Sequence, residues 1–445
     1  MKERAHILPM VLLVASAYLW GCADSGSPVS GDGGDAVGDD SGSGGGDAGG
    51  GEPDGGGGSP DAGQADAGQA DAGGDAGGAD GGVADAGTLP DAETPTALAD
   101  ATPGWFGQLA FSPPADSWLV VTQSGGVVGR IMGNDGAPVT DVFSVSPPEQ
   151  NASWAPSIAY APDADVYLVV WVDYTNDGWQ AWGRFVGGDG AMPGAAFALA
   201  LDKPVPNQGG DRTSSLAYDP KNNRFVYAWH GTHLVTIGMD GSQGTIVDIV
   251  GADDPTAHWG ASVAVNPDKN EYCVAYDRRN GPSIALSRVD AATMSAGAES
   301  TAAITSTNVL VAYNTVEKNY LYVYDTGYVT GVKAKLLGSC DLNDVAAEFD
   351  VLPAEGTASV AYNPASNMYA VIAQNADNDG NTWAVFDSTG AVLATGDPYL
   401  GASNGNYAPE IAPNITDGTF AAISSRDYTQ TRFVANIGFK THTGR

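Results

Sequence analysis

One hairpin pattern recurs seven times along the 445-residue chain, and this recurrence limits the fold more than any other feature. Each copy has a short extended segment, a tight turn, and a run of β-branched and aromatic residues. In SIAYAPDADVYLVVWVD (Ser157 to Asp173), Pro162 to Asp165 predict a turn, and Val166 to Val172 predict a strand covered on both faces. The first segment of each copy contains a marker alanine: Ala110, Ala159, Ala217, Ala264, Ala312, Ala361 and Ala412.

Each unit continues beyond its hairpin. A third strand ends in a Gly turn in several copies, as in WGRFVGGDG from Trp182, and a weaker fourth strand follows, as in FALAL from Phe197. Four antiparallel strands in about 49 residues match one blade of a β-propeller. The seventh copy supplies only three strands, and TALADA at Thr96 to Ala101 resembles a fourth. We therefore predict an all-β, seven-bladed β-propeller of four-stranded antiparallel blades over residues 96–445, whose N-terminal strand completes the last blade.

Residues 1–22 have the features of an export signal. Lys2 and Arg4 give a basic start, and the apolar stretch Ile7 to Trp20 is too short for a stable membrane-spanning helix. The sequence Leu-Trp-Gly-Cys ending at Cys22 resembles the bacterial lipoprotein signal, although Trp stands where a small residue is usual. The resemblance implies lipidation of Cys22, and Ala23 after it implies the outer membrane of the cell envelope. The alternative is an ordinary secretory signal.

Residues 23–95 form a Gly/Asp/Ala low-complexity tract. Between Ala23 and Asp100 there are 17 acidic residues and no Lys or Arg. Too few large apolar residues are present to offset chain entropy, so we expect a disordered linker. Random-coil scaling gives it a reach of roughly 45 Å, which suits a tether between a membrane and a folded domain.

Charge and cysteine content exclude some partners. The formal net charge of −34 would repel phosphates, so we expect no nucleic-acid partner. Cationic partners or a divalent metal remain compatible with this charge. Outside the signal, Cys273 and Cys340 can pair in an oxidising compartment or stay separate.

The expected ring gathers distant residues on one face. If the first strand of each blade is innermost, the connections entering first strands and the turns leaving second strands lie on the same side of the disc. Four entering connections carry an aromatic residue five positions before the marker alanine: Trp105, Trp154, Trp259 and Tyr407. These aromatics either form a broken ring for stacking on a glycan or peptide, or pack between neighbouring blades.

Three histidines converge by the same geometry. His230 and His233 follow the second strand of the third unit, and His258 enters the fourth unit. Three neutral imidazoles are a zinc ligand set with an open position. The alternative is hydrogen bonding at the rim of the face.

An acidic loop in the sixth unit offers a second metal hypothesis. Asn375, Asp377 and Asp379 alternate before Gly380, which matches the opening of a calcium loop but lacks an evident terminal acid. The alternative is an Asp-Gly hairpin turn. Calcium is therefore a possible cofactor, and none is certain.

Two further repeat positions carry charge. Arginines share a position in the third strand, and acids share one at the end of the second strand. We expect these residues to be partners within blades: Arg130, Arg184 and Arg288 with Asp173, Asp277 and Asp325.

The sequence contains no Ser-His-Asp, GxSxG or P-loop pattern. The repeats resemble those of secreted bacterial propellers, and with the lipoprotein signal the chain resembles a myxobacterial-type lipoprotein. The prediction is a surface-tethered, non-catalytic binding or scaffold propeller, with a glycan or peptide ligand on the loop-bearing face and a membrane partner through its lipid anchor. The alternative is a carbohydrate-active enzyme, a glycoside hydrolase or lyase, with carboxylates at the channel mouth.

Overall fold

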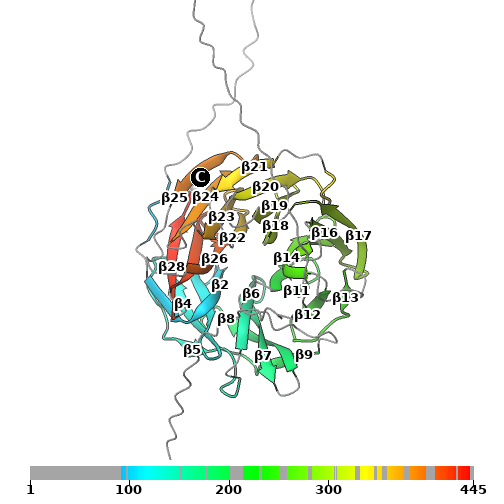
Figure 1. Ribbon diagram of the computed structural model, residues 1–445. Helices are drawn as coiled ribbons and strands as arrows, with labels where there is room; N and C mark the ends of the chain where they lie inside the picture. The colour runs from blue at the N-terminus through cyan, green and yellow to red at the C-terminus, as the bar shows by residue number, and fades with distance from the viewer. Residues whose placement is uncertain are drawn as a thin grey trace, which may run out of the picture. The chain divides into compact units, whose positions relative to one another are not determined.

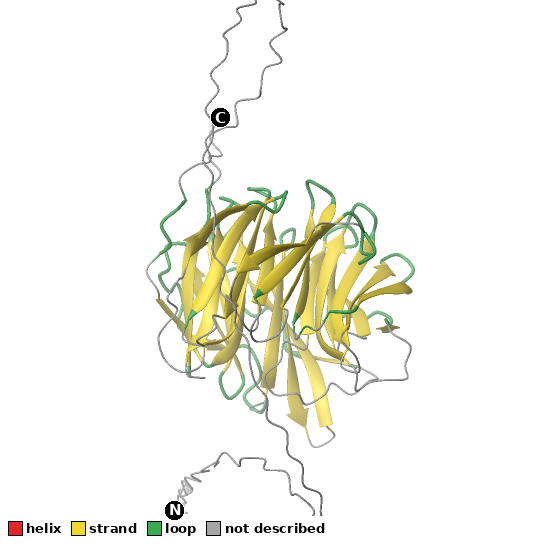
Figure 2. Cartoon of the chain, turned by 45° about the horizontal axis from the view of Figure 1, so that its top comes forward, coloured by secondary structure: helices red, strands yellow, loops and turns green. Residues whose placement is uncertain are grey.

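Seven four-stranded antiparallel sheets form a ring in the computed structural model (Figure 1). The structure describes residues 92–96, 99–150, 153–175, 178–200, 214–229, 233–249, 258–278, 283–304, 306, 308–325, 331–344, 348–352, 358–374, 380–396, 406–426 and 429–440. These residues form strands and loops and no helix, so none of them builds a helix that could cross a membrane (Figure 2). The predicted seven-bladed β-propeller is confirmed.

The blades follow the chain in order, and we number them I to VII. Blade I contains β2 (Trp105–Ser112), β3 (Ser117–Gln123), β4 (Val127–Gly133) and β5 (Phe143–Ser144). Blade II contains β6 (Ser153–Ala161), β7 (Val166–Thr175), β8 (Gly178–Gly187) and β9 (Phe197–Leu199). Blade III contains β10 (Ser214–Asp219), β11 (Arg224–Trp229), β12 (His233–Gly238) and β13 (Val247–Asp248). Blade IV contains β14 (His258–Asn266), β15 (Glu271–Arg278), β16 (Ser283–Asp290) and β17 (Ser295–Ala302).

The remaining blades have the same order. Blade V contains β18 (Val309–Asn314), β19 (Asn319–Asp325), β20 (Val332–Leu337) and β21 (Glu348–Leu352). Blade VI contains β22 (Ala358–Asn363), β23 (Met368–Gln374), β24 (Asn381–Asp387) and β25 (Val392–Gly396). Blade VII contains β26 (Asn406–Pro413), β27 (Phe420–Arg426), β28 (Gln430–Ile437) and, from the N-terminal side, β1 (Ala99–Pro103).

The first hairpin of each blade follows from its turn chemistry. In blades III to VII an Asn or Asp at the end of the first strand accepts backbone N–H bonds from the turn, as Asn314 does from Val316 and Glu317, both at 2.8 Å. The residue that closes the turn adopts a left-handed conformation, such as Asp165 with φ 48° or Asn367 with φ 53°. The second strand that follows is covered on both faces, and all seven residues of β3 are buried.

In blades I, II, III and VI the third and fourth strands are joined by the expected Gly turn. Gly190 has φ 83°, a left-handed conformation that glycine adopts without a steric penalty. The Asp189 carboxylate accepts the N–H of Ala191 at 2.8 Å and closes the same turn. The fourth strands vary in length: β5 and β13 have two residues each, whereas β17 has eight.

The N-terminal strand closes the ring as predicted, slightly further along the chain than expected. β1 pairs antiparallel with β28, with Ala99 opposite Phe433, and it runs over residues 99–103 rather than 96–101. Thr96 adds two bonds just before the strand, both with Ala435. The outer edge of blade VII is therefore covered by the other end of the propeller chain.

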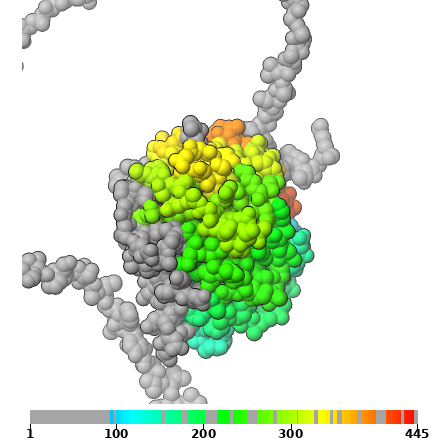
Figure 3. All heavy atoms as spheres, turned by 90° about the vertical axis from the view of Figure 1, so that its right-hand side faces the viewer, coloured from blue at the N-terminus to red at the C-terminus, as the bar shows by residue number. Residues whose placement is uncertain are grey.

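The hydrophobic core is divided among the contacts between blades. Each of seven buried clusters joins the facing sides of two adjacent blades; one of them packs Leu119 and Val121 of blade I against Tyr167 and Val169 of blade II. The cluster between blades VII and I contains Ala101 of β1 and Trp118. Seen from the side, successive blades follow one another around the rim (Figure 3). Among the residues that the structure describes, no blade has a buried cluster of its own, so the ring must close for these residues to be buried.

Buried tyrosines add polar contacts between blades. The hydroxyl of Tyr320 in blade V donates to Glu271 of blade IV at 2.8 Å, and that of Tyr272 in blade IV donates to Asp219 of blade III at 2.6 Å. Burial raises the pKa of both tyrosines above the usual value, so each hydroxyl stays protonated and remains a donor.

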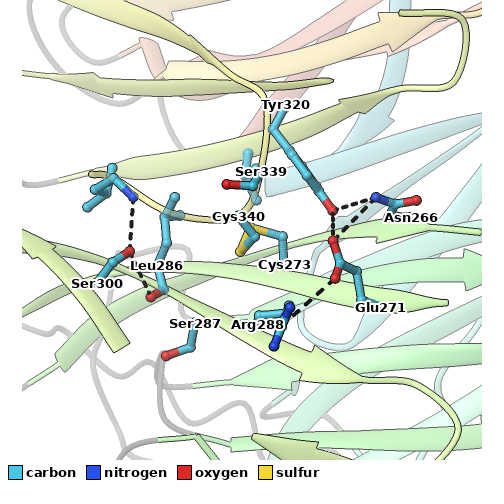
Figure 4. Close-up of a disulfide and its surroundings, with 12 residues drawn as sticks. Asn266, Glu271, Cys273, Leu286, Ser287, Arg288, Ser300, Tyr320, Ser339 and Cys340 are labelled. Atoms are coloured by element: carbon cyan, nitrogen blue, oxygen red, sulfur yellow. Dashed lines mark hydrogen bonds and ion pairs between the residues drawn. A yellow bond between two sulfur atoms is a disulfide. The ribbon is translucent and has the colours of Figure 1, made fainter. Parts of the chain in front are cut away.

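A disulfide joins blades IV and V. Cys273 of β15 and Cys340, which follows β20, have Cα atoms 5.6 Å apart and lie within the cluster between these blades. Figure 4 shows the bond beside the bonds that link Glu271 to Tyr320, Asn266 and Arg288. The pairing that the sequence left open is present.

The repeated arginines do not pair with the acids at the ends of the second strands. Arg130 donates to the backbone carbonyl groups of Ala101 and Asp100, at 3.1 and 3.3 Å, and Arg184 donates to the carbonyl of Val145 at 2.8 Å. Arg288 lies 3.9 Å from Glu271. The expectation of matched Arg–Asp pairs was wrong, because Arg130 and Arg184 reach outward to the fourth strand of the preceding blade.

The contribution of the closing strand β1 to stability can be tested by two neighbouring substitutions. Ala101→Asp places a charge in the cluster between blades VII and I, where the side chain is 1% exposed, and should lower the free energy of unfolding by about 3 kcal/mol. The exposed neighbour Asp100→Asn should cost less than about 1 kcal/mol. Denaturant unfolding measures the free energy of unfolding of each variant. Equal losses of stability in the two variants would contradict the burial of β1 in the contact between blades VII and I.

The disulfide closes a 67-residue separation, so its loss should lower the free energy of unfolding by about 2 to 4 kcal/mol. The measurement is denaturant unfolding of the wild type with and without reductant, beside a Cys273→Ala, Cys340→Ala double variant. Reductant should shift the wild-type midpoint and leave the double variant unchanged. If reductant leaves the denaturant midpoint of the wild type unchanged, the disulfide does not form.

Candidate functional site

We call one side of the ring the loop face: the side with the connections into first strands and the turns between second and third strands. Trp105, Trp154, Trp259 and Tyr407 lie at this end of β2, β6, β14 and β26, as predicted. A register shift follows each aromatic residue, for example between Trp105 and Gln108 and between Tyr407 and Glu410. Such bulges redirect side chains and are frequent beside binding sites. The structure describes the backbone of these four residues and not their side chains.

Polar residues are buried opposite three of these aromatics, and the fourth, Trp154, pairs with Val172. Across the ladder, Trp105 pairs with Gln123, Trp259 with Asp277, and Tyr407 with Ser425. The equivalent positions of blades V and VI carry Asp325 and Gln374, and in blade II Asp173 lies one residue beyond that position; all six polar side chains are at most 8% exposed.

Three of these polar residues have unmet hydrogen-bonding capacity. Within the described structure, Gln123 Oε1, Gln374 Nε2 and Ser425 Oγ are buried without a hydrogen-bond partner. A buried polar atom without a partner costs about 1 to 3 kcal/mol. The three residues belong to three consecutive blades, VI, VII and I.

Of the three histidines, His233 is the one whose side chain is described. It begins β12, and its Nδ1 lies 2.8 Å from Asp248 of β13, with the imidazole tilted against Trp229 at 5.2 Å between ring centroids. This is a contact of neighbouring strands within blade III. His230 lies outside the described residues, as does the side chain of His258, so the three-histidine site stays a prediction.

The calcium hypothesis also rests on residues beyond the described part. Asn375, Asp377 and Asp379 lie outside it, and the described chain resumes at Gly380. Among the residues that the structure does describe, no three His, Cys, Asp or Glu side chains are grouped to hold a metal ion.

The ring encloses a polar cavity on its axis. Its volume is about 210 Å³, and residues of the first-strand region of six blades line it. Most lie one to four positions before the marker alanine, so the cavity occupies the half of the channel toward the loop face. First strands are therefore innermost, as the sequence analysis assumed.

We call one ring of positions the axial belt: the residue two before each marker alanine. It consists of Gln108, Ser157, Ser215, Ser262, Leu310, Ser359 and Glu410. Six of these seven line the cavity; Ser157 is the exception. The sequence analysis did not identify the belt, because four serines on strands are not a distinctive pattern. Alignment of the repeats on the marker alanine would have revealed it.

Belt side chains bond the first strand of the next blade. Ser262 Oγ accepts the N–H of Val311 at 3.1 Å, and Ser215 Oγ accepts the N–H of Val263 at 3.3 Å. The amide oxygen of Gln108 accepts the N–H of Ile158 at 2.9 Å. The belt thus connects blade to blade around the channel.

Glu410 is the one acid among the described residues that line the cavity. Its carboxylate accepts a hydrogen bond from Ser359 Oγ at 2.5 Å and from Gln108 Nε2 at 3.3 Å. The side chain therefore bridges blades VI, VII and I, the same three blades that carry unmet polar atoms nearer the loop face.

Comparisons with known proteins identify the fold. No protein-family model and no curated protein sequence matches the chain. Among solved structures, 995 chains match. Hydrazine synthase of Kuenenia stuttgartiensis has a TM-score of 0.53 at 11% identity, covering 77% of this chain and 97% of that one. Raptor of Chaetomium thermophilum has a TM-score of 0.55 at 13% identity, covering 78% of this chain and 29% of that one. Identities this low establish shared architecture and carry no function.

Proposed function

We propose that this chain is a lipid-anchored, non-catalytic binding propeller of the bacterial cell envelope, with its ligand on the loop face. A glycan fits this site better than a peptide. The observation that carries the proposal is the juxtaposition of aromatic and polar residues at the same strand ends: Trp105 across from Gln123, and Tyr407 across from Ser425. Aromatic surface combined with neutral amides and hydroxyls is the chemistry that holds a sugar.

The rigidity of the ring supports a binding role. The closing strand, the seven clusters between blades and the disulfide fix the ends of the first and second strands. A ligand that bridges several blades would then pay little to order its site. The described residues that line the axial cavity include one carboxylate, Glu410, whereas a glycoside hydrolase uses two.

The proposed location rests on the N-terminal sequence and on the disulfide. Disulfides persist in oxidising compartments, and the bond between Cys273 and Cys340 suits a protein exported from the cytoplasm. With lipid on Cys22, the long acidic linker would hold the propeller away from the outer membrane surface.

Anchoring is tested by Cys22→Ser. The wild-type chain should fractionate with outer membranes and gain the mass of lipid on its N-terminal peptide, because buried acyl chains hold it there. The variant should lose that mass and leave the membrane fraction, with Cys273→Ala as the control that leaves Cys22 intact. Wild-type protein without lipid would contradict the anchor.

Ligand binding is tested on a glycan and peptide array. Trp105→Ala and Tyr407→Ala should each weaken the glycan signal by tenfold or more, equivalent to about 1.4 kcal/mol. The control is Tyr218→Ala, an aromatic residue at the opposite end of its first strand, whose signal should persist while folding is verified by unfolding curves. An array without hits, or turnover of the bound glycan, would contradict a non-catalytic glycan-binding role.

A further inference from the structure

The outer edge of blade IV differs from the outer edges of the other blades. We propose that β17, the fourth strand of this blade, pairs with β17 of a second copy of the chain, so that two propellers associate edge to edge about a two-fold axis. The proposal concerns the rim of the disc, and it requires neither the ligand nor the lipid of the proposed function.

β17 is the longest of the fourth strands. It contains eight residues, whereas the fourth strands of the other blades contain two to five. It lies at the outside of the ring (Figure 1), and Ser295 to Ala298 and Thr301 are exposed. In an antiparallel pair, every second residue directs its N–H and C=O away from the partner strand. β17 therefore presents a row of these groups on the side away from β16, and such an edge is a template for a further strand.

At two other rims, side chains of the following blade bind the outer backbone. Arg130 of blade I donates to two carbonyl groups of β1, and Arg184 of blade II donates to the carbonyl of Val145, next to β5. Blade V has Lys335 at the same repeat position, and Lys335 pairs with Glu348 of its own blade at 3.8 Å. Blade V therefore does not cover the carbonyl groups of β17 in this way.

The backbone of β17 has few other partners. Among the described residues, the one hydrogen bond that reaches it from outside the ladder with β16 runs from the N–H of Ile304 to the carbonyl of Ala302, at 2.8 Å. Blade V bonds a side chain of this strand, since the N–H of Leu342 donates to Ser300 Oγ at 3.0 Å. The outward N–H and C=O groups of β17 are thus available to a neighbouring strand.

The sequence of β17 has little to oppose pairing. Lys, other charged residues and Pro are the usual means of keeping edge strands apart, and SAGAESTA contains no Lys, Arg or Pro. Its one charged side chain, Glu299, forms an ion pair with Arg278 of β15 at 3.4 Å. A bulge places Gly297 and Ala298 opposite Arg288, and this limits the number of bonds that a partner strand can form.

The charges around the edge indicate which partner fits. A basic peptide would suit the net charge of −34, but the side chain beside Gly297 is that of Arg288, which is itself a cation and is 63% exposed. A second β17 brings one carboxylate that is already paired. The long-range repulsion between two acidic chains is largely screened at physiological salt, where the Debye length is about 8 Å.

Symmetry limits the assembly to two copies. Pairing of β17 with itself is isologous, so it uses the same edge of both chains and closes as a dimer. The two four-stranded blades would then form one continuous sheet across the contact. The interface is small, so we expect weak association, which copies anchored to the same membrane would strengthen through their raised effective concentration.

The test uses the full-length chain with Cys22→Ser, which carries no lipid and cannot form a disulfide between copies through that residue. Small-angle X-ray scattering is measured up to about 1 mM, the effective concentration that a short tether provides. The mass should rise from monomer to dimer and no further, and molar salt should strengthen the dimer because it screens the repulsion. Hydrogen exchange should slow with concentration at Ser295 to Ala302 and stay unchanged in the edge strand β25.

Substitutions at the exposed Thr301 identify the contact. Thr301→Lys and Thr301→Glu should each weaken dimerisation by about fivefold or more, because each brings like charges together across the paired strands. An equimolar mixture of the two variants should recover the dimer, since opposite charges then meet, and recovery also shows that both variants fold. Ala292→Lys adds the same charge in the turn before β17 and should dimerise as the parent does.

Three results would overturn the proposal. A chain that stays monomeric throughout would leave the edge to a strand of another protein. Association that grows beyond a dimer, or that protects other residues in place of β17, would assign the contact elsewhere. Dimerisation unchanged in Thr301→Lys would exclude β17 from it. None of these results bears on the glycan array or on the lipid of Cys22, so the proposed function stands or falls separately.

Discussion

Closure of the ring is the constraint on which the rest of this structure depends. A single four-stranded blade cannot bury its two faces, and every described hydrophobic cluster is shared by two blades. The last interface must therefore be made between chain segments some 330 residues apart, a separation whose loop entropy grows only slowly with length. Three layers hold this seam: the β1–β28 ladder outside, the cluster around Ala101 and Trp118, and the Gln108–Glu410 bond at the axis.

Much of the fold could be predicted because its signals are local. Turn residues and unbroken β-branched runs act within a few positions, so first and second strands were readable in every unit. Fourth strands were predicted for some units, as at Phe197 where β9 lies, but not in every unit, because a strand such as β5, with two residues and one neighbour, is weakly constrained in composition. The closing strand β1 also pairs with one neighbour, β28, and it lies a few residues from its predicted position because its composition is equally weakly constrained. The Arg130 contact was misjudged because its partners are backbone carbonyl groups, which no side-chain pattern reveals.

The candidate site also contains some residues that the sequence indicates and others that only the folded structure reveals. Trp105 and Tyr407 stand out in the sequence because aromatic residues at a fixed repeat position are conspicuous, and in the structure both lie at the loop-face ends of their first strands. The polar atoms of Gln123 and Ser425 were not found, because unmet hydrogen bonding is a property of three-dimensional packing. The axial belt can be recognised in the sequence only when the seven repeats are aligned on the marker alanine.

The belt explains how one ring of positions can both join neighbouring blades and line the cavity. Serine is short enough to accept the N–H of the next blade at this position, as Ser215 and Ser262 do. Leu310 and Glu410 replace serine at the belt positions of blades V and VII, and nearby contacts compensate for the lost serine bonds. Beside Leu310, Asn308 donates its amide to the carbonyl of Ala358 at 2.9 Å and restores a contact between blades V and VI. Glu410 recovers contacts to both of its neighbours through Ser359 and Gln108. Blades V and VII can therefore set the shape and polarity of the cavity while the ring around them stays closed.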